Sequence, residues 1–191
     1  MSLRGLHCSG LHLRMALALC CSSALPDPAA AQTGPSTPYQ FRALYLFNFA
    51  KYTEWPKESF ADDAAPFVLG ILGADPFGKD IDIIKGKSIK NRKLDVQYFS
   101  TAEEARDCHI LFISPSEKDR LAEILRALQN SSILTVSEIE GFIDQHGMVN
   151  LAEEKMAEEK KRLIFEINQA AAEKVKLKLD ARLLQLAKVR K

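Results

Sequence analysis

The sequence of 191 residues is poor in cysteine and in long hydrophobic runs. Three of its four cysteines, Cys8, Cys20 and Cys21, lie near the N-terminus, and only Cys108 lies farther along. A single cysteine excludes an intramolecular disulfide in that larger part of the chain. After residue 31 the longest apolar run is Phe67 to Leu72, far short of the ~20 residues that a transmembrane helix needs. This part of the chain is therefore not a polytopic membrane protein.

The chain also lacks an excess of charge of either sign. It has 26 Lys and Arg against 25 Asp and Glu, a formal net charge of +1. Nucleic acids and acidic lipids are attracted by a surplus of basic side chains, so nonspecific nucleic-acid binding is excluded. A hydrophobic content of 47% is that of one ordinary globular domain.

The first 31 residues have the three-part layout of a secretory signal peptide. Arginines flank a weakly apolar start, an apolar stretch runs from Met15 to Leu25, and alanines at positions 29 and 31 supply a cleavage site. We expect cleavage after Ala31, which leaves Cys108 as the only cysteine of an exported protein. A plain N-terminal helix would have to tolerate Pro26 and Pro28. Lipidation of Cys20 or Cys21 is a further alternative, although bulky residues precede both.

The rest of the chain reads as a linker, residues 32–37, and one domain, residues 38–191. Thr37 and Pro38 are the N-cap and first residue of a helix that should end near Glu54. The pattern then alternates between strands and short helices, which predicts an α/β fold, a layered sandwich with a largely parallel sheet flanked by helices. The strands are expected at residues 67–72, 94–99, 109–113, 133–136, 148–151 and 163–167, and the helices at 78–84, 115–128, 137–143 and after Asp180.

The charged stretch Ala152 to Lys161 joins the last two of these strands. It holds two near-copies of the motif Ala-Glu-Glu-Lys, too few and too short for a solenoid. We expect a solvated helical turn or loop here, with an acidic docking segment as the alternative.

Catalytic motifs are incomplete. Gly73 to Asp80 resembles a phosphate-binding P-loop, but Asp80 stands where Ser or Thr must hold magnesium and Pro76 removes an amide. We therefore expect a turn at Asp75 to Gly78 at the carboxyl edge of the sheet. No serine has a nucleophile elbow, and Cys108, His109 and His146 lack the spacing of a zinc site. The sequence predicts neither an enzyme nor a cofactor or metal site, an inert buried Cys108, and a satisfied His109 at a strand end.

The first helix carries more aromatic side chains than one core-facing stripe can bury. It is either buried deep in the core or packs one side on the sheet and the other on a second subunit or partner protein. The second alternative gives four candidate partner-binding residues, Phe41, Tyr45, Phe49 and Tyr52.

Two polar side chains, Glu166 and Asn168, project from one face of the strand 163–167. In the structural alternative, Glu166 pairs with Arg162 or Arg182 and Asn168 caps the helix that follows. In the functional alternative, they line a small ligand pocket with residues of the next segment, Lys178, Asp180 and Arg182.

The order of these segments resembles the YfiR-like family over nearly all of residues 38 to 190. The resemblance is carried by residues 41–56, 67–73, 75–78 and 108–114, and by Phe165 to Asn168 with Leu183 and Leu184. It implies a periplasmic α/β protein, often a homodimer, that represses an inner-membrane diguanylate cyclase by binding its periplasmic domain, and so controls cyclic di-GMP and biofilm formation. It also implies small ligands, an aromatic amino acid or a nucleotide, near the segment Glu166 to Arg182.

Two departures from the family limit what carries over. The best-known member has disulfides, whereas this chain has only Cys108 after residue 31. The charged stretch Ala152 to Lys161 is longer than the usual hairpin. The alternative function is a periplasmic small-ligand-binding module that serves another sensor kinase or a transport system.

Overall fold

The first helix begins where the sequence predicts. The computed structural model describes residues 36–155 and 161–190, so the predicted signal peptide lies outside the described residues. The hydroxyl of Thr37 accepts a hydrogen bond from the amide of Gln40 over 3.1 Å, and α1 follows over Pro38–Lys51. It ends before the expected Glu54 because Thr53–Glu54 form the short strand β1, which pairs with β9 (Lys178–Leu179).

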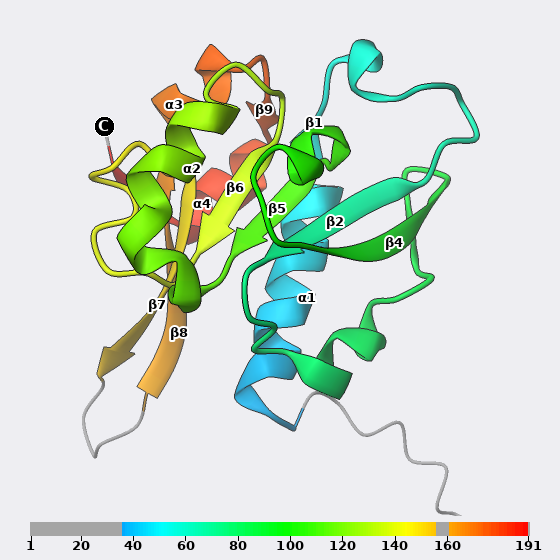
Figure 1. The fold of residues 1–191 in the computed structure, drawn as a ribbon. Coiled ribbons are helices and arrows are strands. Elements are labelled where there is room, and N and C mark those ends of the chain that lie inside the picture. Colours follow the sequence, from blue (N-terminus) through cyan, green and yellow to red (C-terminus); the bar gives the residue numbers. More distant parts are fainter. Residues whose placement is uncertain (1–35, 156–160, 191) are drawn as a thin grey trace, which may run out of the picture. The chain divides into compact units, whose positions relative to one another are not determined.

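The central feature is an eight-stranded sheet with the order β10-β8-β7-β6-β5-β2-β4-β3 (Figure 1). Two strands in its middle, β2 (Phe67–Leu72) and β5 (Ile110–Ile113), are parallel neighbours, with Leu69 opposite Ile110. The other strands are β3 (Ser88–Ile89), β4 (Arg92–Phe99), β6 (Leu134–Ser137), β7 (Val149–Lys155), β8 (Lys161–Asn168) and β10 (Lys188–Arg190).

The α/β class is confirmed, and the parallel arrangement is confirmed in part. Strands β4, β2, β5, β6 and β7 are parallel to one another. Antiparallel pairs then appear toward both edges, β3 with β4 and β8 with β7, while β10 is parallel to β8. The sheet is therefore mixed. Between β3 and β4 only Lys90 and Asn91 intervene, a connection short enough for an antiparallel pair, because parallel neighbours need a longer crossover.

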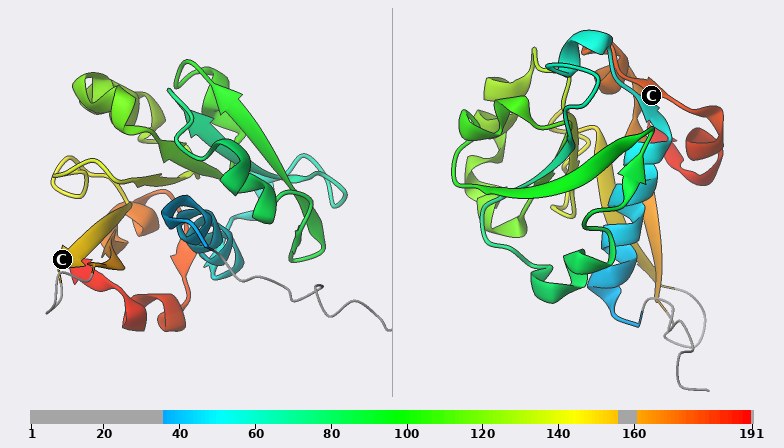
Figure 2. Two further views of the ribbon diagram at one scale, coloured as in Figure 1. Left: turned by 90° about the horizontal axis from the view of Figure 1, so that it is seen from below. Right: turned by 90° about the vertical axis from the view of Figure 1, so that its right-hand side faces the viewer.

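Helices pack on both faces of the sheet, with α1 and α2 on opposite sides (Figure 2). On the α1 face, Leu46 and Phe49 of the helix are buried in one cluster with Leu69 and Phe112 of the sheet. On the other face, α2 (Leu121–Leu128) buries Ile124 in a second cluster with Leu111. Strand β5 supplies both clusters, because alternate side chains point to opposite faces. The remaining helices are α3 (Gln169–Lys174) and α4 (Ala181–Leu186), with short 3-10 helices at 57–59, 78–83, 104–107 and 115–120.

Two predicted segments differ from the structure. Residues 140–146 form turns, so the short helix expected up to Ile143 is absent, because Ser137 ends β6 with its hydroxyl bonded to the carbonyl of Ile113 and Gly141 has a φ of +74°. Of the stretch predicted as a helical turn or loop at 152–161, residues 152–155 instead extend β7 and Lys161 begins β8, while residues 156–160 lie outside the described residues. Cross-strand ion pairs hold this extension, Glu153 with Lys161 at 2.9 Å and Glu154 with Arg162 at 2.8 Å.

Candidate functional site

The carboxyl edge between β2 and β5 is closed by side chains. Strand order reverses between these two strands, the place where open α/β sheets commonly bind ligands. Here a Cβ on Gly73, which has a φ of +89°, would lie 2.5 Å from both Ser116 Oγ and Glu117 Oε1. The turn expected at Asp75 to Gly78 is present, because the Asp75 carboxylate accepts hydrogen bonds from the amides of Phe77 and Gly78. These amides are therefore not free to hold a phosphate.

The outward side of α1 carries three of the four aromatic residues predicted to bind a partner. Phe41 is 47% exposed, and Tyr45 and Tyr52 are half-buried. Phe49 does not belong to this surface, because its side chain is fully buried and packs edge-on against Phe165 at 5.2 Å. We call Phe41, Tyr45 and Tyr52 the α1 surface.

Tyr45 is tied to the core beneath the α1 surface. Its ring lies 5.5 Å from the ring of Phe165 and 6.0 Å from that of Phe49. Tyr52 lies at the other end of the helix, and the guanidinium of Arg182 stacks over its ring at 4.9 Å. Phe41 is thus the side chain of this surface with the most freedom to contact another protein.

Arg42 joins α1 to the carboxyl edge of the sheet. Its Nε donates to Glu138 over 2.7 Å and its Nη2 to Glu153 over 3.1 Å. Burial opposes the charge of Arg42, but its bonds to these two carboxylates outweigh that effect and raise its pKa. The hydroxyl of Tyr39 also donates to Glu138. A charged position inside an otherwise apolar helix was the sequence signal for this network, although the sequence could not indicate its partners.

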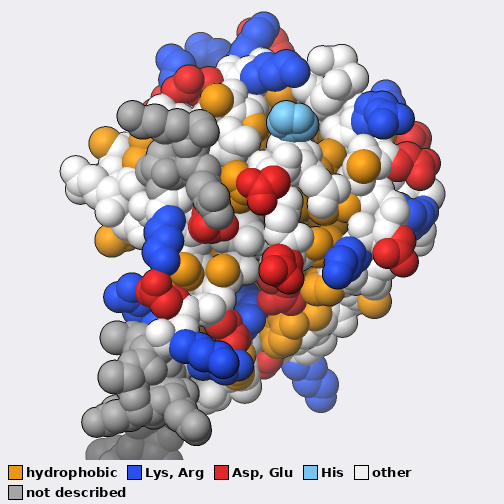
Figure 3. Space-filling model, turned by 90° about the vertical axis from the view of Figure 1, so that its left-hand side faces the viewer, with side chains coloured by type: hydrophobic (Ala, Val, Ile, Leu, Met, Phe, Trp, Pro, Cys, Tyr) orange, Lys and Arg blue, Asp and Glu red, His pale blue; other side chains and the backbone are white. Residues whose placement is uncertain are grey.

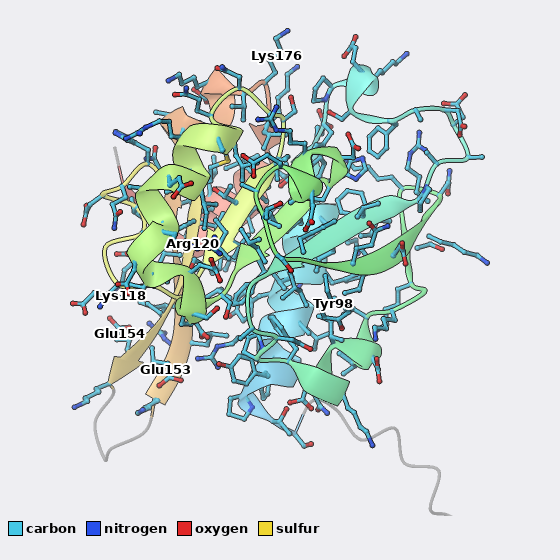
Figure 4. All side chains as sticks on the ribbon, in the orientation of Figure 1. Tyr98, Lys118, Arg120, Glu153, Glu154 and Lys176 are labelled. Carbon is cyan, nitrogen blue, oxygen red and sulfur yellow. The ribbon has the colours of Figure 1, made fainter. Side chains whose placement is uncertain are left out.

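The predicted ligand residue Glu166 lines a cavity of about 780 Å³ at this end of the molecule. Arg42, Glu138, Asn150 and Glu153 line the same cavity, which also holds two further carboxylates, those of Glu140 and Asp144. Carboxylates thus outnumber the one guanidinium in its lining. Glu153 and Glu154 mark this end in Figure 4, where Lys176 lies at the opposite end of the domain.

The other four predicted ligand residues lie outside that cavity. Asn168 caps α3, since its Oδ1 accepts a hydrogen bond from the amide of Ala171 over 3.0 Å. Asp180 caps α4 and forms an ion pair with Arg182 at 2.6 Å, and hydrogen bonds from Arg182 lower the pKa of Asp180. Lys178 is exposed opposite Glu54 in the β1–β9 pair. The structure brings Lys178, Asp180 and Arg182 together near Tyr52, whose carbonyl accepts from the Asp180 amide, but not with Glu166.

Cys108 and His109 are buried, as predicted. Cys108 is 4% exposed, and burial raises the pKa of its thiol to about 12, so the thiolate that makes a cysteine reactive is scarce at neutral pH. His109 has partners for both ring nitrogens, the amide of Val68 and the carbonyl of Ser59. Within residues 36–155 and 161–190, no group of three or more His, Cys, Asp or Glu is placed to hold a metal ion.

Sequence reasoning missed the aromatic cluster around His109. The ring of Phe60 stacks on His109 at 4.3 Å, and Arg92 stacks over Phe60 at 4.0 Å. These side chains come from three separate segments, and only the buried strand at 109–113 gave any signal. On the face shown in Figure 3, acidic, basic and hydrophobic side chains are interspersed. No helix in the described part of the chain has the length and apolar character needed to cross a membrane.

Comparison with known proteins gives one family and one fold. A family model described as YfiR/HmsC-like matches residues 39–188. A search of curated proteins found no match. Among solved structures, the chain is similar to a conserved domain protein from Vibrio cholerae, with a TM-score of 0.56 and 10% sequence identity over 81% of this chain. The similarity covers 60% of the Vibrio chain, and at this identity it shows the fold alone.

Proposed function

Because the chain belongs to the YfiR/HmsC-like family, we propose that it is a periplasmic regulatory protein that binds an inner-membrane diguanylate cyclase. In this proposal it represses the enzyme by contacting its periplasmic sensor domain, and so links envelope signals to cyclic di-GMP and biofilm formation. The family match over residues 39–188 carries the proposal. It assigns no catalytic activity to the chain. Export with cleavage after Ala31 is part of it.

The α1 surface is the place that we propose for the contact with the cyclase. Aromatic side chains are enriched in the cores of protein interfaces, where a few buried anchors supply most of the binding energy. Phe41, exposed at 47%, is the anchor that this surface offers. Tyr45 and Tyr52 are half-buried along the same helix, so they extend the apolar contact at little cost in side-chain entropy.

Phe41→Asp is the variant that tests this contact. A charge buried in an interface without a partner should weaken binding by about 2 kcal/mol or more, which corresponds to about a 30-fold loss of affinity. Tyr45→Asp is a poorer choice, because Tyr45 also packs against Phe49 and Phe165. The matched control is Tyr98→Asp, since Tyr98 is 50% exposed and belongs to β4 and not to α1 (Figure 4).

Binding to membranes that contain the candidate cyclase is measured together with the circular dichroism of each variant. We expect Phe41→Asp to lose binding while Tyr98→Asp retains it, with both spectra unchanged. Equal binding by both variants contradicts the proposed surface. If the wild-type protein binds no diguanylate cyclase in these membranes, the proposed partner is wrong. Sedimentation of the same variants shows whether α1 instead holds a homodimer, in which case Phe41→Asp is monomeric.

A small-ligand-binding module for another sensor kinase or a transport system is the second candidate, and the cavity at Glu166 favours it. Its lining of five carboxylates and one guanidinium would attract an ammonium group and repel a phosphate. Of the two ligand classes implied by the family, we therefore propose an aromatic amino acid over a nucleotide. Lys178, Asp180 and Arg182 do not line this cavity, so a ligand site at these three residues is a separate proposal.

Calorimetric titration with L-phenylalanine and with a nucleoside monophosphate tests the second candidate. We expect heat of binding for the amino acid only, and its loss in Glu166→Gln. Binding of the nucleotide, with no response to the amino acid, contradicts this assignment of the cavity. In the same assay, Asp180→Asn tests ligand binding at Lys178, Asp180 and Arg182.

A further inference from the structure

A cavity of about 600 Å³ lies between α2 and α3. Its volume falls in the range of about 300 to 1,000 Å³ that is typical of small-molecule sites. It shares only Asp144 with the cavity at Glu166 and no residue with the α1 surface. We call it the α2–α3 cavity. Its walls come from the two helices: Ala122, Leu125 and Arg126 of α2, and Ala170, Ala171 and Lys174 of α3.

Alanines on both helices leave this space open. Ala122 of α2 and Ala170 and Ala171 of α3 line the cavity with single methyl groups. Side chains between packed elements normally interdigitate and leave few voids larger than a water molecule. Methyl groups are too short to do so here, so the two helices leave room for an occupant.

The interior of the α2–α3 cavity is aliphatic. Leu128, Met148 and Val175 line it and are buried. The polar side chains beside them already have partners, since Thr135 accepts a hydrogen bond from the amide of Met148 over 3.2 Å and Asn168 caps α3. No Phe, Tyr or Trp is among the lining residues. The cavity therefore offers its occupant aliphatic contact and no aromatic ring to stack on.

Two basic side chains stand at this cavity, one from each helix. Arg126 lies in the last turn of α2 and Lys174 in the last turn of α3, and both are exposed. Within the part of the chain that the structure describes, neither is paired with a carboxylate. Asp144 is the only carboxylate of the lining. The charge balance is thus the opposite of that in the cavity at Glu166.

We propose that the α2–α3 cavity binds a medium-chain fatty acid, with its carboxylate at Arg126 and Lys174 and its alkyl chain inside the cavity. An aliphatic interior with exposed cations matches an alkyl chain that carries an anionic head group. The carbonyl ends of the two helices have partial negative charge and disfavour an anion, so its binding depends on the two basic side chains. The inference rests neither on the cyclase nor on the ligand proposed at Glu166.

Burial of the alkyl chain makes the affinity depend on its length. Each buried methylene group strengthens binding about fourfold. Decanoate, which is longer than octanoate by two methylene groups, should therefore bind at least about tenfold more tightly. Decyltrimethylammonium has the same alkyl chain with the opposite charge, so it should bind this cavity at least about tenfold more weakly than decanoate does.

The purified protein is titrated with monomeric octanoate, decanoate and decyltrimethylammonium. The NMR signals of the Met148 and Ala171 methyl groups report on the cavity itself, because both residues line it. We expect these signals to respond to decanoate at the lowest concentration of the three. Equal affinity for octanoate and decanoate, or decanoate binding that leaves both methyl signals unchanged, overturns the proposal.

Arg126→Glu and Lys118→Glu are the paired variants. Both residues are exposed and both substitutions change the net charge equally, but Lys118 precedes α2 and does not line the cavity (Figure 4). Arg126→Glu should weaken decanoate binding at least about tenfold, whereas Lys118→Glu should leave it unchanged. Equal effects of the two substitutions would mean that only the overall charge matters, and would contradict the proposed site.

Ala171→Leu tests the space between the helices. Ala171 is half-buried and lines the cavity, so a longer side chain at this position enters the space that the alkyl chain would take. We expect decanoate binding to be lost, and circular dichroism shows whether the variant is folded. Wild-type affinity in the folded variant contradicts the proposal. If the variant does not fold, the comparison of Arg126→Glu with Lys118→Glu still decides.

Two further ligands test other occupants of the α2–α3 cavity. Phosphatidylglycerol vesicles test whether Arg126 and Lys174 instead face an anionic membrane. Vesicle binding that Arg126→Glu abolishes, without any binding of monomeric decanoate, overturns the proposal. A stronger response of the Met148 methyl signal to L-phenylalanine than to decanoate would assign the cavity to an amino acid and would also overturn it.

Discussion

The guanidinium of Arg42 donates a hydrogen bond from Nε to Oε2 of Glu138 over 2.7 Å, and the two side chains are only 11% and 12% exposed. The pair connects the first helix with the segment that follows β6. Removal of one partner of a buried ion pair leaves the other charge desolvated and uncompensated. Removal of one member of the network around Arg42 should therefore destabilise the fold. Replacement of the whole network by apolar side chains need not do so.

Arg42→Met should lower the free energy of unfolding by about 3 kcal/mol. The matched control is Arg162→Met, because Arg162 is 59% exposed and pairs with Glu154 across the β7–β8 hairpin. Exposed pairs contribute at most about 1 kcal/mol, so this variant should remain close to wild type. Urea unfolding of both variants measures the difference. An equal decrease in the free energy of unfolding would show that the burial of Arg42 does not affect the contribution of its ion pairs to stability.

Gly147→Ala should destabilise the domain by about 2 kcal/mol. A Cβ at Gly147 would lie 2.3 Å from the ring of Phe142, which is fully buried and would have to shift within the core. Gly78→Ala is the comparison, because Gly78 has a φ of +52° but no atom within 4 Å of an added Cβ. Its cost should be about 1 kcal/mol, from the backbone alone. Thermal unfolding that ranks the two in the opposite order contradicts this account.

Asn168→Ala should cost about 1 kcal/mol, because Asn168 Oδ1 caps α3 at the amide of Ala171. Asn168→Asp retains an acceptor oxygen at the N-cap and should restore most of that stability. Guanidinium unfolding compares the two variants. A loss of ligand binding in Asn168→Asp, at wild-type stability, would instead favour the ligand-binding role expected from the sequence.

Cys108 should react slowly with a thiol reagent in the native protein. The thiol is buried and its pKa is raised to about 12 by that burial, so both access and thiolate are lacking. Labelling is followed by absorbance with and without denaturant, on protein from which residues 1–31 have been removed. Fast labelling without denaturant would mean that the strand at Cys108 opens readily.

The parts of the fold that the sequence predicted are those with a local signal. The apolar runs at β2 and β5 predict strands buried on both faces, and Thr37 and Asp180 are recognisable helix caps that the structure confirms. The outer half of the β7–β8 hairpin has no such signal. Its strands lie beyond the core and are held by ion pairs such as Glu154 with Arg162, so a charged sequence was interpreted as a turn or loop.

The candidate sites show the same division. The apolar neighbours of Cys108 predicted its burial. The caps at Asn168 and Asp180 were predicted from their residue types at the start of a helix. The grouping of Glu166 with Lys178, Asp180 and Arg182 did not follow in the structure, because strand alternation gives the face of Glu166 but not the path of the chain after α3. The attachment of residues 57–66 to His109 and Arg92 joins segments distant in sequence, which no local pattern reveals.

The position of α1 in the chain has a consequence for biogenesis. It is the first element of the described fold, yet its Leu46 and Phe49 share a cluster with Phe165, Ile167 and Leu183 near the C-terminus. Contacts between such distant residues form slowly, because a long loop must close before they are gained. The flank of the helix that contacts these C-terminal residues therefore stays uncovered until nearly the whole chain is available, and an exported chain would depend on holding chaperones during that interval.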